Sequence, residues 1–267
     1  MHFMPMNSRQ TKFAVVFCLV AITVCASSQL PGASDSPGTS DNERIELSIF
    51  DIYSGNLETI IDFLDRGADV NVRYGSDEKT PLMMAVIGGN HSLAALLLER
   101  GADPNLLTPE SGHTALSLAA RRDSLTIVSL LIAHGADVTI RGSNSFDALS
   151  WAVRGNAVRV AQLLIENKAD VNARYEGGDT PLIGAASLNV AAVARVLLEN
   201  GAEVNAVNEA DETALHVAAG MGSPEVATLL LDSGADPARE DVKGQTPLDV
   251  ARHKEQEAII NLLERRR

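Results

Sequence analysis

The sequence predicts an all-α solenoid of about seven stacked helix-turn-helix units, each with a hairpin finger. Two markers recur in phase every 33 or 34 residues, which is the signature of a repeat architecture. The chain is also 45% hydrophobic but only 4% aromatic, a balance that favours closely packed helices rich in Ala, Leu and Val. The first marker comprises Thr80, Thr114, Asp147, Thr180, Thr213 and Thr246, and the second comprises Gly67, Gly101, Gly135, Lys168, Gly201 and Gly234.

Residues 1–26 are predicted to form a signal peptide. Arg9 and Lys12 precede the apolar run Phe13–Val24, which is shorter than the ~20 residues that a membrane-spanning helix needs. Small residues follow the run, and cleavage is expected after Ala26. We therefore expect export, with the periplasm as the first destination and secretion or an envelope anchor as alternatives.

The anchor alternative depends on Cys25. Residues 22–25 resemble the lipobox of bacterial lipoproteins, in which the cysteine carries the lipid, although Val24 stands where a smaller residue is expected. The remaining cysteine, Cys18, lies in the same segment. Removal of the segment would therefore leave no thiol for a disulfide, a zinc site or a nucleophile.

Residues 27–45 have no apolar period and are predicted to be a flexible polar tether, and residues 46–267 form the repeat domain. The units are expected to begin near residues 46, 80, 114, 147, 180, 213 and 246, and are called units one to seven here. Unit one carries acidic residues on its outer face, as the exposed end of a stack requires. Unit seven keeps both helices, lacks the finger and ends in three arginines.

The local sequence of each unit explains the repeat. A Thr caps the first helix and Pro81, Pro181 and Pro247 occupy its first turn, where no amide hydrogen is missed. In the second helix of unit six, Val226, Leu229 and Leu230 form one apolar stripe. Ser223 precedes Pro224 and is expected to cap that helix.

Residues 213–237 read TALHVAAGMGSPEVATLLLDSGADP, and this unit resembles the ankyrin repeat. TPLMMA, TALSLAA, TPLIGAA and TPLDVA carry the same opening, and RGADVN, RGADPN and NGAEVN carry the same close. The resemblance implies that the His216 ring bonds the backbone between repeats. It also implies that a protein partner binds in a concave groove, formed by the fingers and the exposed ends of the first helices.

Unit four departs from this pattern. Phe146-Asp147-Ala148 replaces the usual residue–Thr–Pro, and Lys168 replaces the turn glycine. Asp147 can still cap the helix. Lys168 must either adopt a left-handed conformation, at a cost of about 1 kcal/mol, or end the helix in another way.

The sequence holds no recognisable catalytic, cofactor or metal motif, so we expect no enzyme, no cofactor and no metal. The histidines other than His216 lie at unrelated positions in different units. A net charge of −13 disfavours nucleic acid and anionic membrane surfaces. We expect a monomer whose repeat domain does not insert into a membrane.

Partner-binding candidates follow when the groove positions of the ankyrin repeat are transferred to this sequence. The apolar candidates would be unusual on a purely solvated face, and Arg121 and Arg154 occupy one position in adjacent units, as a local positive island. Trp151 falls on the inner apolar position and is interpreted as a core residue. The candidates are Tyr53, Ile87, Arg121, Arg122, Phe146, Arg154, Leu188 and Met221.

Three functions remain open at this point. The first is a non-enzymatic interaction scaffold of the cell envelope, and the second is a secreted effector or immunity-type protein acting on a host or competitor protein. The third is an enzyme with a site in one of the irregular loops, Tyr74–Lys79 or Leu107–His113, each of which carries one extra residue. Neither loop offers an evident nucleophile and base.

Overall fold

The computed structural model describes residues 49–143 and 145–266. The predicted signal peptide with Cys25, the tether and the first residues of unit one lie outside this range. Within it, no helix is both long and apolar enough to cross a membrane.

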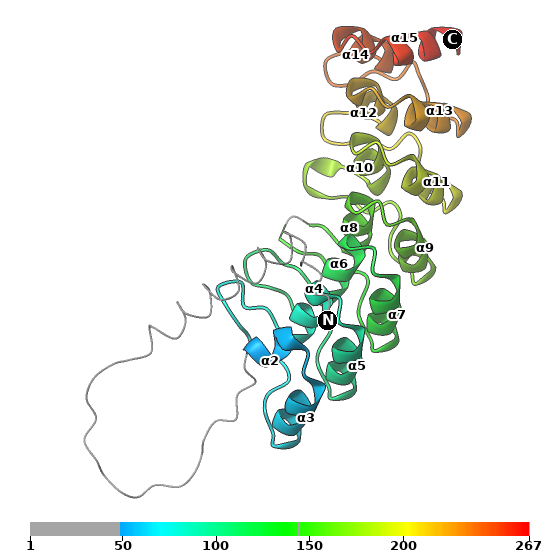
Figure 1. Ribbon diagram of the computed structural model, residues 1–267. Coiled ribbons are helices and arrows are strands. Elements are labelled where there is room, and N and C mark those ends of the chain that lie inside the picture. The colour runs from blue at the N-terminus through cyan, green and yellow to red at the C-terminus, as the bar shows by residue number, and fades with distance from the viewer. Residues whose placement is uncertain (1–48, 144, 267) are drawn as a thin grey trace, which may run out of the picture. The chain divides into compact units, whose positions relative to one another are not determined.

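Seven helix pairs follow one another in the described part of the chain, one for each predicted unit (Figure 1). The predicted all-α solenoid of about seven repeats is thereby confirmed. The pairs are α2 Ile49–Ser54 and α3 Leu57–Asp65, α4 Pro81–Gly88 and α5 His91–Glu99, α6 Ala115–Arg121 and α7 Leu125–Ala133, α8 Ala148–Arg154 and α9 Val158–Glu166, α10 Pro181–Ser187 and α11 Ala191–Glu199, α12 Ala214–Met221 and α13 Pro224–Asp232, and α14 Pro247–His253 and α15 Glu257–Arg265.

Short helices of this kind are stable only because they stack. Each first helix from α2 to α14 packs on the first helix of the next unit, and the second helices from α5 onward do the same. Their buried Leu, Ile, Val and Ala side chains merge into one continuous core from Ile52 to Leu263. No unit could bury this surface alone, so stability is a property of neighbouring units.

The caps of the first helices form as predicted. The Thr80 hydroxyl accepts a hydrogen bond from the Met83 amide at 3.3 Å, and Asp147 performs the same role for the Ser150 amide at 2.9 Å. Each bond satisfies one of the free amides at a helix start.

The prediction that Ser223 caps α13 is wrong. Its side chain accepts no capping bond, and its buried hydroxyl has no hydrogen-bond partner among the described residues.

His216 lies where the resemblance implied. Its Nδ1 accepts from the Thr213 amide at 3.2 Å, and its Nε2 lies 3.0 Å from the Gln245 carbonyl of the next finger. The first bond leaves the proton on Nε2, which therefore donates to Gln245. The buried ring thus ties the first helix of unit six to the finger that leads into unit seven, and its role is structural.

The fingers are joined by a ladder of asparagine side chains. The side-chain oxygens of Asn71 and Asn105 accept from the amides of Asp103 and Asp137 in the next unit, at 2.9 and 2.8 Å. Asn172 and Asn205 form the same bond further along. Thr139 takes the asparagine position in unit three, and its hydroxyl bonds Asp137 within its own finger instead. The described residues therefore show no such rung between units three and four.

Lys168 adopts the left-handed conformation, with φ of 73°. The lysine Cβ is strained there, whereas glycine tolerates the same angles. We expect Lys168→Gly to raise the free energy of unfolding by about 1 kcal/mol, measured by thermal or urea unfolding. Lys168→Ala keeps a Cβ and serves as the control, which should gain nothing. An unchanged or lower melting temperature for the glycine variant would contradict this account of the turn.

Candidate functional site

Three aromatic rings and a histidine, contributed by units two to four, gather on the side of the stack that carries the fingers. The Phe146 ring meets Trp151 at 5.8 Å and Tyr175 at 5.2 Å between centroids, both nearly edge to face. The centroid of the His113 ring lies 4.7 Å from that of the Trp151 ring. Burial, followed by the nearby charges of Arg121 and Lys79, lowers the pKa of His113. Such pairs hold one another rigidly and form a pre-ordered surface.

Two arginines lie over these rings. The Arg121 guanidinium is 5.3 Å from the Trp151 ring centroid, and that of Arg154 is 4.7 Å from Phe146 and 5.9 Å from Trp151. Both side chains are exposed, and neither forms an ion pair with a described residue. The stacking orients the two cations while leaving their hydrogens free for a ligand. We call Arg121, Phe146, Trp151, Arg154 and Tyr175 the aromatic–arginine cluster.

A buried acid supports this cluster from below. Asp147 is 3% exposed, and the Tyr175 hydroxyl donates to its carboxylate at 3.3 Å. Burial raises the pKa of Asp147, although the bonds from Ser150 and Tyr175 and the charge of Arg141 act in the opposite direction. Burial also raises the pKa of Tyr175, so that its hydroxyl stays protonated as a donor. The pair fixes the Tyr175 ring against Phe146.

The burial of Asp147 predicts how the stability of the protein depends on pH. Its folded pKa lies above the unfolded value, so the folded protein binds more protons in the interval between the two, and stability falls as pH rises through it. Asp147→Asn keeps an oxygen for the Ser150 amide and removes the charge. We expect the variant to lose this part of the pH slope and to be the more stable protein at neutral pH.

Urea unfolding across the acidic range would measure this effect. Asp137→Asn is the matched control, because hydrogen bonds from Thr139 lower the pKa of this exposed carboxyl and give the opposite slope. Equal pH profiles for wild type and Asp147→Asn would contradict the prediction.

A hollow of about 470 Å³ opens beside the cluster, between α8, α10 and the finger that joins units four and five. Its walls include Phe146, Arg154 and Tyr175 from the cluster, and Leu188 beyond the end of α10. Volumes of this order are typical of binding pockets in proteins. The groove face therefore has both a part that carries two cations and a recess.

The structure gathers some of the sequence-predicted candidates and separates others. Arg121, Phe146 and Arg154 belong to the cluster, and Leu188 lines the hollow with 43% of its surface exposed. The other four candidates lie at the ends of the first helices in their own units. Tyr53 and Met221 are exposed, Arg122 follows Arg121 at the surface, and Ile87 is half-buried.

Sequence reasoning missed three members of the site. Trp151 packs against the core as interpreted, but it is only half-buried and lies under Arg121. Tyr175 and Gly184 were not singled out. The sequence did contain a signal for two of them at the inner position, which lies four residues after each capping residue. Trp151 and Gly184, the largest and the smallest residues at this position, belong to adjacent units. In units two to seven the position is occupied by Met84, Leu118, Trp151, Gly184, Val217 and Val250.

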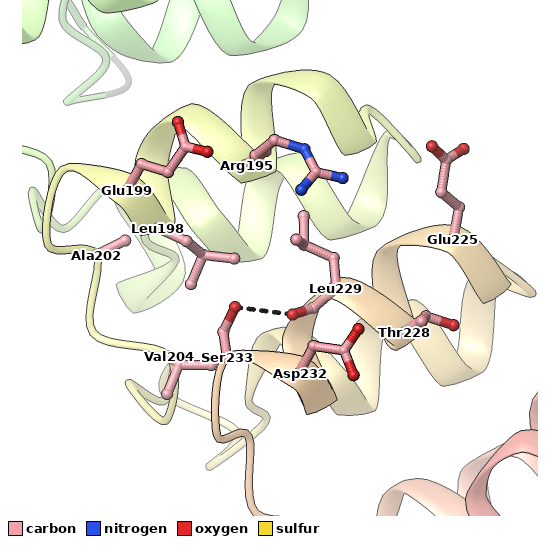
Figure 2. A pocket seen from close by; sticks show the side chains of 10 residues that line it. All are labelled: Arg195, Leu198, Glu199, Ala202, Val204, Glu225, Thr228, Leu229, Asp232 and Ser233. Carbon is pink, nitrogen blue, oxygen red and sulfur yellow. Dashed lines mark hydrogen bonds between the residues drawn. The ribbon is translucent and has the colours of Figure 1, made fainter.

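A second hollow of about 650 Å³ lies between the second helices α11 and α13 (Figure 2). Arg195 reaches over an apolar floor of Leu198 and Leu229, with the acids Glu225 and Asp232 on the facing helix. The Ser233 hydroxyl there donates to the Leu229 carbonyl at 2.8 Å. This hollow lacks aromatic side chains, and acids surround its one arginine, so it presents no net positive surface.

The irregular loops show no catalytic arrangement among the described residues. Ser117 Oγ lies 3.4 Å from His113 Nδ1, but its hydroxyl donates to the Thr114 carbonyl at 2.9 Å and belongs to the cap of α6. The Thr108 and Ser111 hydroxyls bond each other at 2.7 Å. The described residues also contain no group of three or more His, Cys, Asp or Glu that could hold a metal ion.

Family models for ankyrin repeats match the chain in three segments. These are ankyrin repeats (3 copies) at residues 49–142, an ankyrin repeat at 145–176 and ankyrin repeats (many copies) at 185–231. The ankyrin repeat domain of Bcl-3, described as a unique member of the IkappaB protein family, is similar in structure with a TM-score of 0.72 and 31% identity. The similarity covers 85% of this chain and 100% of that domain. No curated protein sequence matches the chain.

The chain therefore belongs to the ankyrin-repeat family, whose members are interaction scaffolds for other proteins. The aromatic–arginine cluster of this chain is centred on unit four, which departs from the repeat pattern at its cap and at Lys168.

Proposed function

We propose that this protein captures a protein partner through its groove face, with the aromatic–arginine cluster as the centre of the interface. The observation that carries the proposal is that Arg121 and Arg154 lie over Trp151 and Phe146 without an acidic partner in the described part of the chain. Trp, Tyr and Arg are the residues that most often dominate binding energy at protein interfaces. No acid among the described residues is paired with either arginine, so a local ion-pair network does not account for them.

The cluster selects the chemistry of the partner. The chain has 35 acidic and 22 basic residues, so its overall field repels an acidic protein, while the two arginines attract one locally. A partner with a small acidic patch beside apolar residues would satisfy both arginines and cover Phe146. Electrostatic complementarity of this kind fixes the register of the complex as well as its affinity.

A charge-reversal experiment tests the site. The tagged protein is crosslinked in its native cells, and captured proteins are identified by mass spectrometry for wild type and for the double variant Arg121→Glu with Arg154→Glu. The matched control is Arg159→Glu with Arg195→Glu, which reverses two exposed arginines on the second helices α9 and α11. We expect the groove variant to lose a partner that wild type and control retain. Equal capture by all three would place the interface elsewhere.

We also propose that the protein works outside the cytoplasm, in the periplasm or attached to the envelope. The support is the charge and length pattern of residues 1–26, with the polar tether of residues 27–45 behind it. Fractionation of cells and medium tests the destination, and a cytoplasmic full-length chain would overturn the proposal. Incorporation of labelled palmitate, with Cys25→Ala as the control, decides between a lipid anchor and simple cleavage.

A further inference from the structure

The hollow beside the cluster has a specific cause in the sequence. The inner position of the first helix carries a side chain that packs against the core in the neighbouring units, as Trp151 and Val217 do, but unit five has Gly184 there. A Cβ built at Gly184 would have Val153 Cγ1 at 3.9 Å as its nearest neighbour. Packing therefore does not require a glycine at this position. Its helical backbone does not require one either, since Gly184 has no positive φ.

A glycine that neither the backbone nor the packing needs lowers helix stability by about 1 kcal/mol. What it provides at residue 184 is space. The recess is bounded by the Val153 and Leu188 side chains and by the Phe146 ring, which give it an apolar wall. We call this recess the Gly184 hollow.

The charged groups of the hollow are unequal. Arg154 stacks on Phe146 at 4.7 Å and has no acidic partner among the described residues. Asp179, on the finger, already accepts a hydrogen bond from Asn208 at 3.0 Å, and Glu176 is exposed beside it. Arg154 is thus the one cation among the residues that line the hollow, and it is the group there that can pair with a carboxylate of a ligand.

Resting on the proposed function, we infer that the Gly184 hollow receives one large apolar side chain of an extended segment of the partner, while a nearby Asp or Glu of that segment pairs with Arg154. The apolar side chain takes the space that Leu118 or Met84 fills within their own units. The carboxylate binds the exposed edge of a guanidinium that Phe146 already holds in place, so little side-chain entropy is lost on binding.

The test uses a phage-displayed library of random dodecapeptides, selected on the full-length chain. Enriched sequences are synthesised with amidated C-termini, so that only side-chain carboxylates are offered, and their Kd values are measured by fluorescence anisotropy. We expect enriched peptides to hold Leu, Ile, Met or Phe within a few residues of Asp or Glu.

Two variants probe the hollow, each with a control. Gly184→Leu fills the recess with the residue that unit three carries at the same position, and its control, Gly88→Leu, makes the same change at an exposed site on α4. Arg154→Gln removes the cation, and Arg159→Gln is its control on α9. We expect Gly184→Leu to weaken binding about tenfold or more and Arg154→Gln about fivefold or more, with both controls unchanged.

The outcomes separate this inference from the proposed function. Peptides that bind Gly184→Leu as tightly as wild type, but are lost on Arg121→Glu with Arg154→Glu, would overturn the hollow and keep the groove. Peptides whose Kd neither Gly184→Leu nor Arg121→Glu with Arg154→Glu changes would place peptide binding outside the groove face. That result would count against both the hollow and the proposed function. A library that yields no enriched sequence would overturn the hollow as a peptide site. Circular dichroism of each variant checks that the fold is retained.

Discussion

Leu230→Ala is expected to lower the free energy of unfolding by about 2–5 kcal/mol, the cost of removing a large side chain from a packed core. Leu230 is 0% exposed on α13 and belongs to the continuous core between units five, six and seven. The neighbouring helices are held in place by the finger connections as well as by packing, so they cannot collapse fully into the cavity. Part of the lost contact is therefore not recovered.

The effect should be local as well as large. In a repeat protein each unit contacts only its neighbours, so a cavity in unit six weakens its contacts with units five and seven and leaves units two to four unchanged. Hydrogen exchange should accelerate in α12 to α15 more than in α4 to α7. Leu229→Ala is the matched control, because Leu229 is the adjacent, half-buried residue of the same helix. Equal losses from the two variants, measured by urea unfolding, would contradict the assigned core.

The repeat explains why most of the fold could be predicted from the sequence. The Thr caps, the turn glycines and the apolar stripe each indicate one local feature, and their common period places every unit. Lys168 is instructive, because the pattern required a left-handed residue there and the lysine accepts that conformation. The prediction of a cap at Ser223 was wrong because capping depends on the direction of the side-chain hydroxyl, and a Ser-Pro pair does not specify that direction.

The site was predictable only in part, for a physical reason. Arg121 and Arg154 could be placed by their shared position in the repeat, and Phe146 by its place before a cap. The contact of Trp151 with Arg121 crosses from unit four to unit three, and Tyr175 reaches Asp147 over 28 residues of sequence. Such contacts depend on the directions of side chains that lie far apart in the sequence. The Gly184 hollow is harder still, because it depends on a missing side chain.

The second large effect concerns two glycines for which the same substitution should have opposite results. A Cβ at Gly155 would lie 2.5 Å from the Arg121 carbonyl oxygen, which is backbone of the adjacent unit and cannot rotate away. Its φ of −82° is open to any residue, so close packing alone demands glycine. We expect Gly155→Ala to force α6 and α8 apart and to lower the free energy of unfolding by about 1–3 kcal/mol.

Gly184→Ala should instead raise the free energy of unfolding by about 0.5–1 kcal/mol, because the added methyl group meets no atom closer than 3.9 Å and alanine favours the helix. Thermal and urea unfolding of the two variants side by side would measure both signs. If both variants lost stability, Gly184 would be a packing glycine like Gly155, and the hollow would be a by-product of close helix contact. Opposite signs of the two stability changes would mean that Gly155 stabilises unit four through close packing, whereas Gly184 lowers the stability of unit five. A glycine that lowers stability is expected where the space it leaves open serves a ligand.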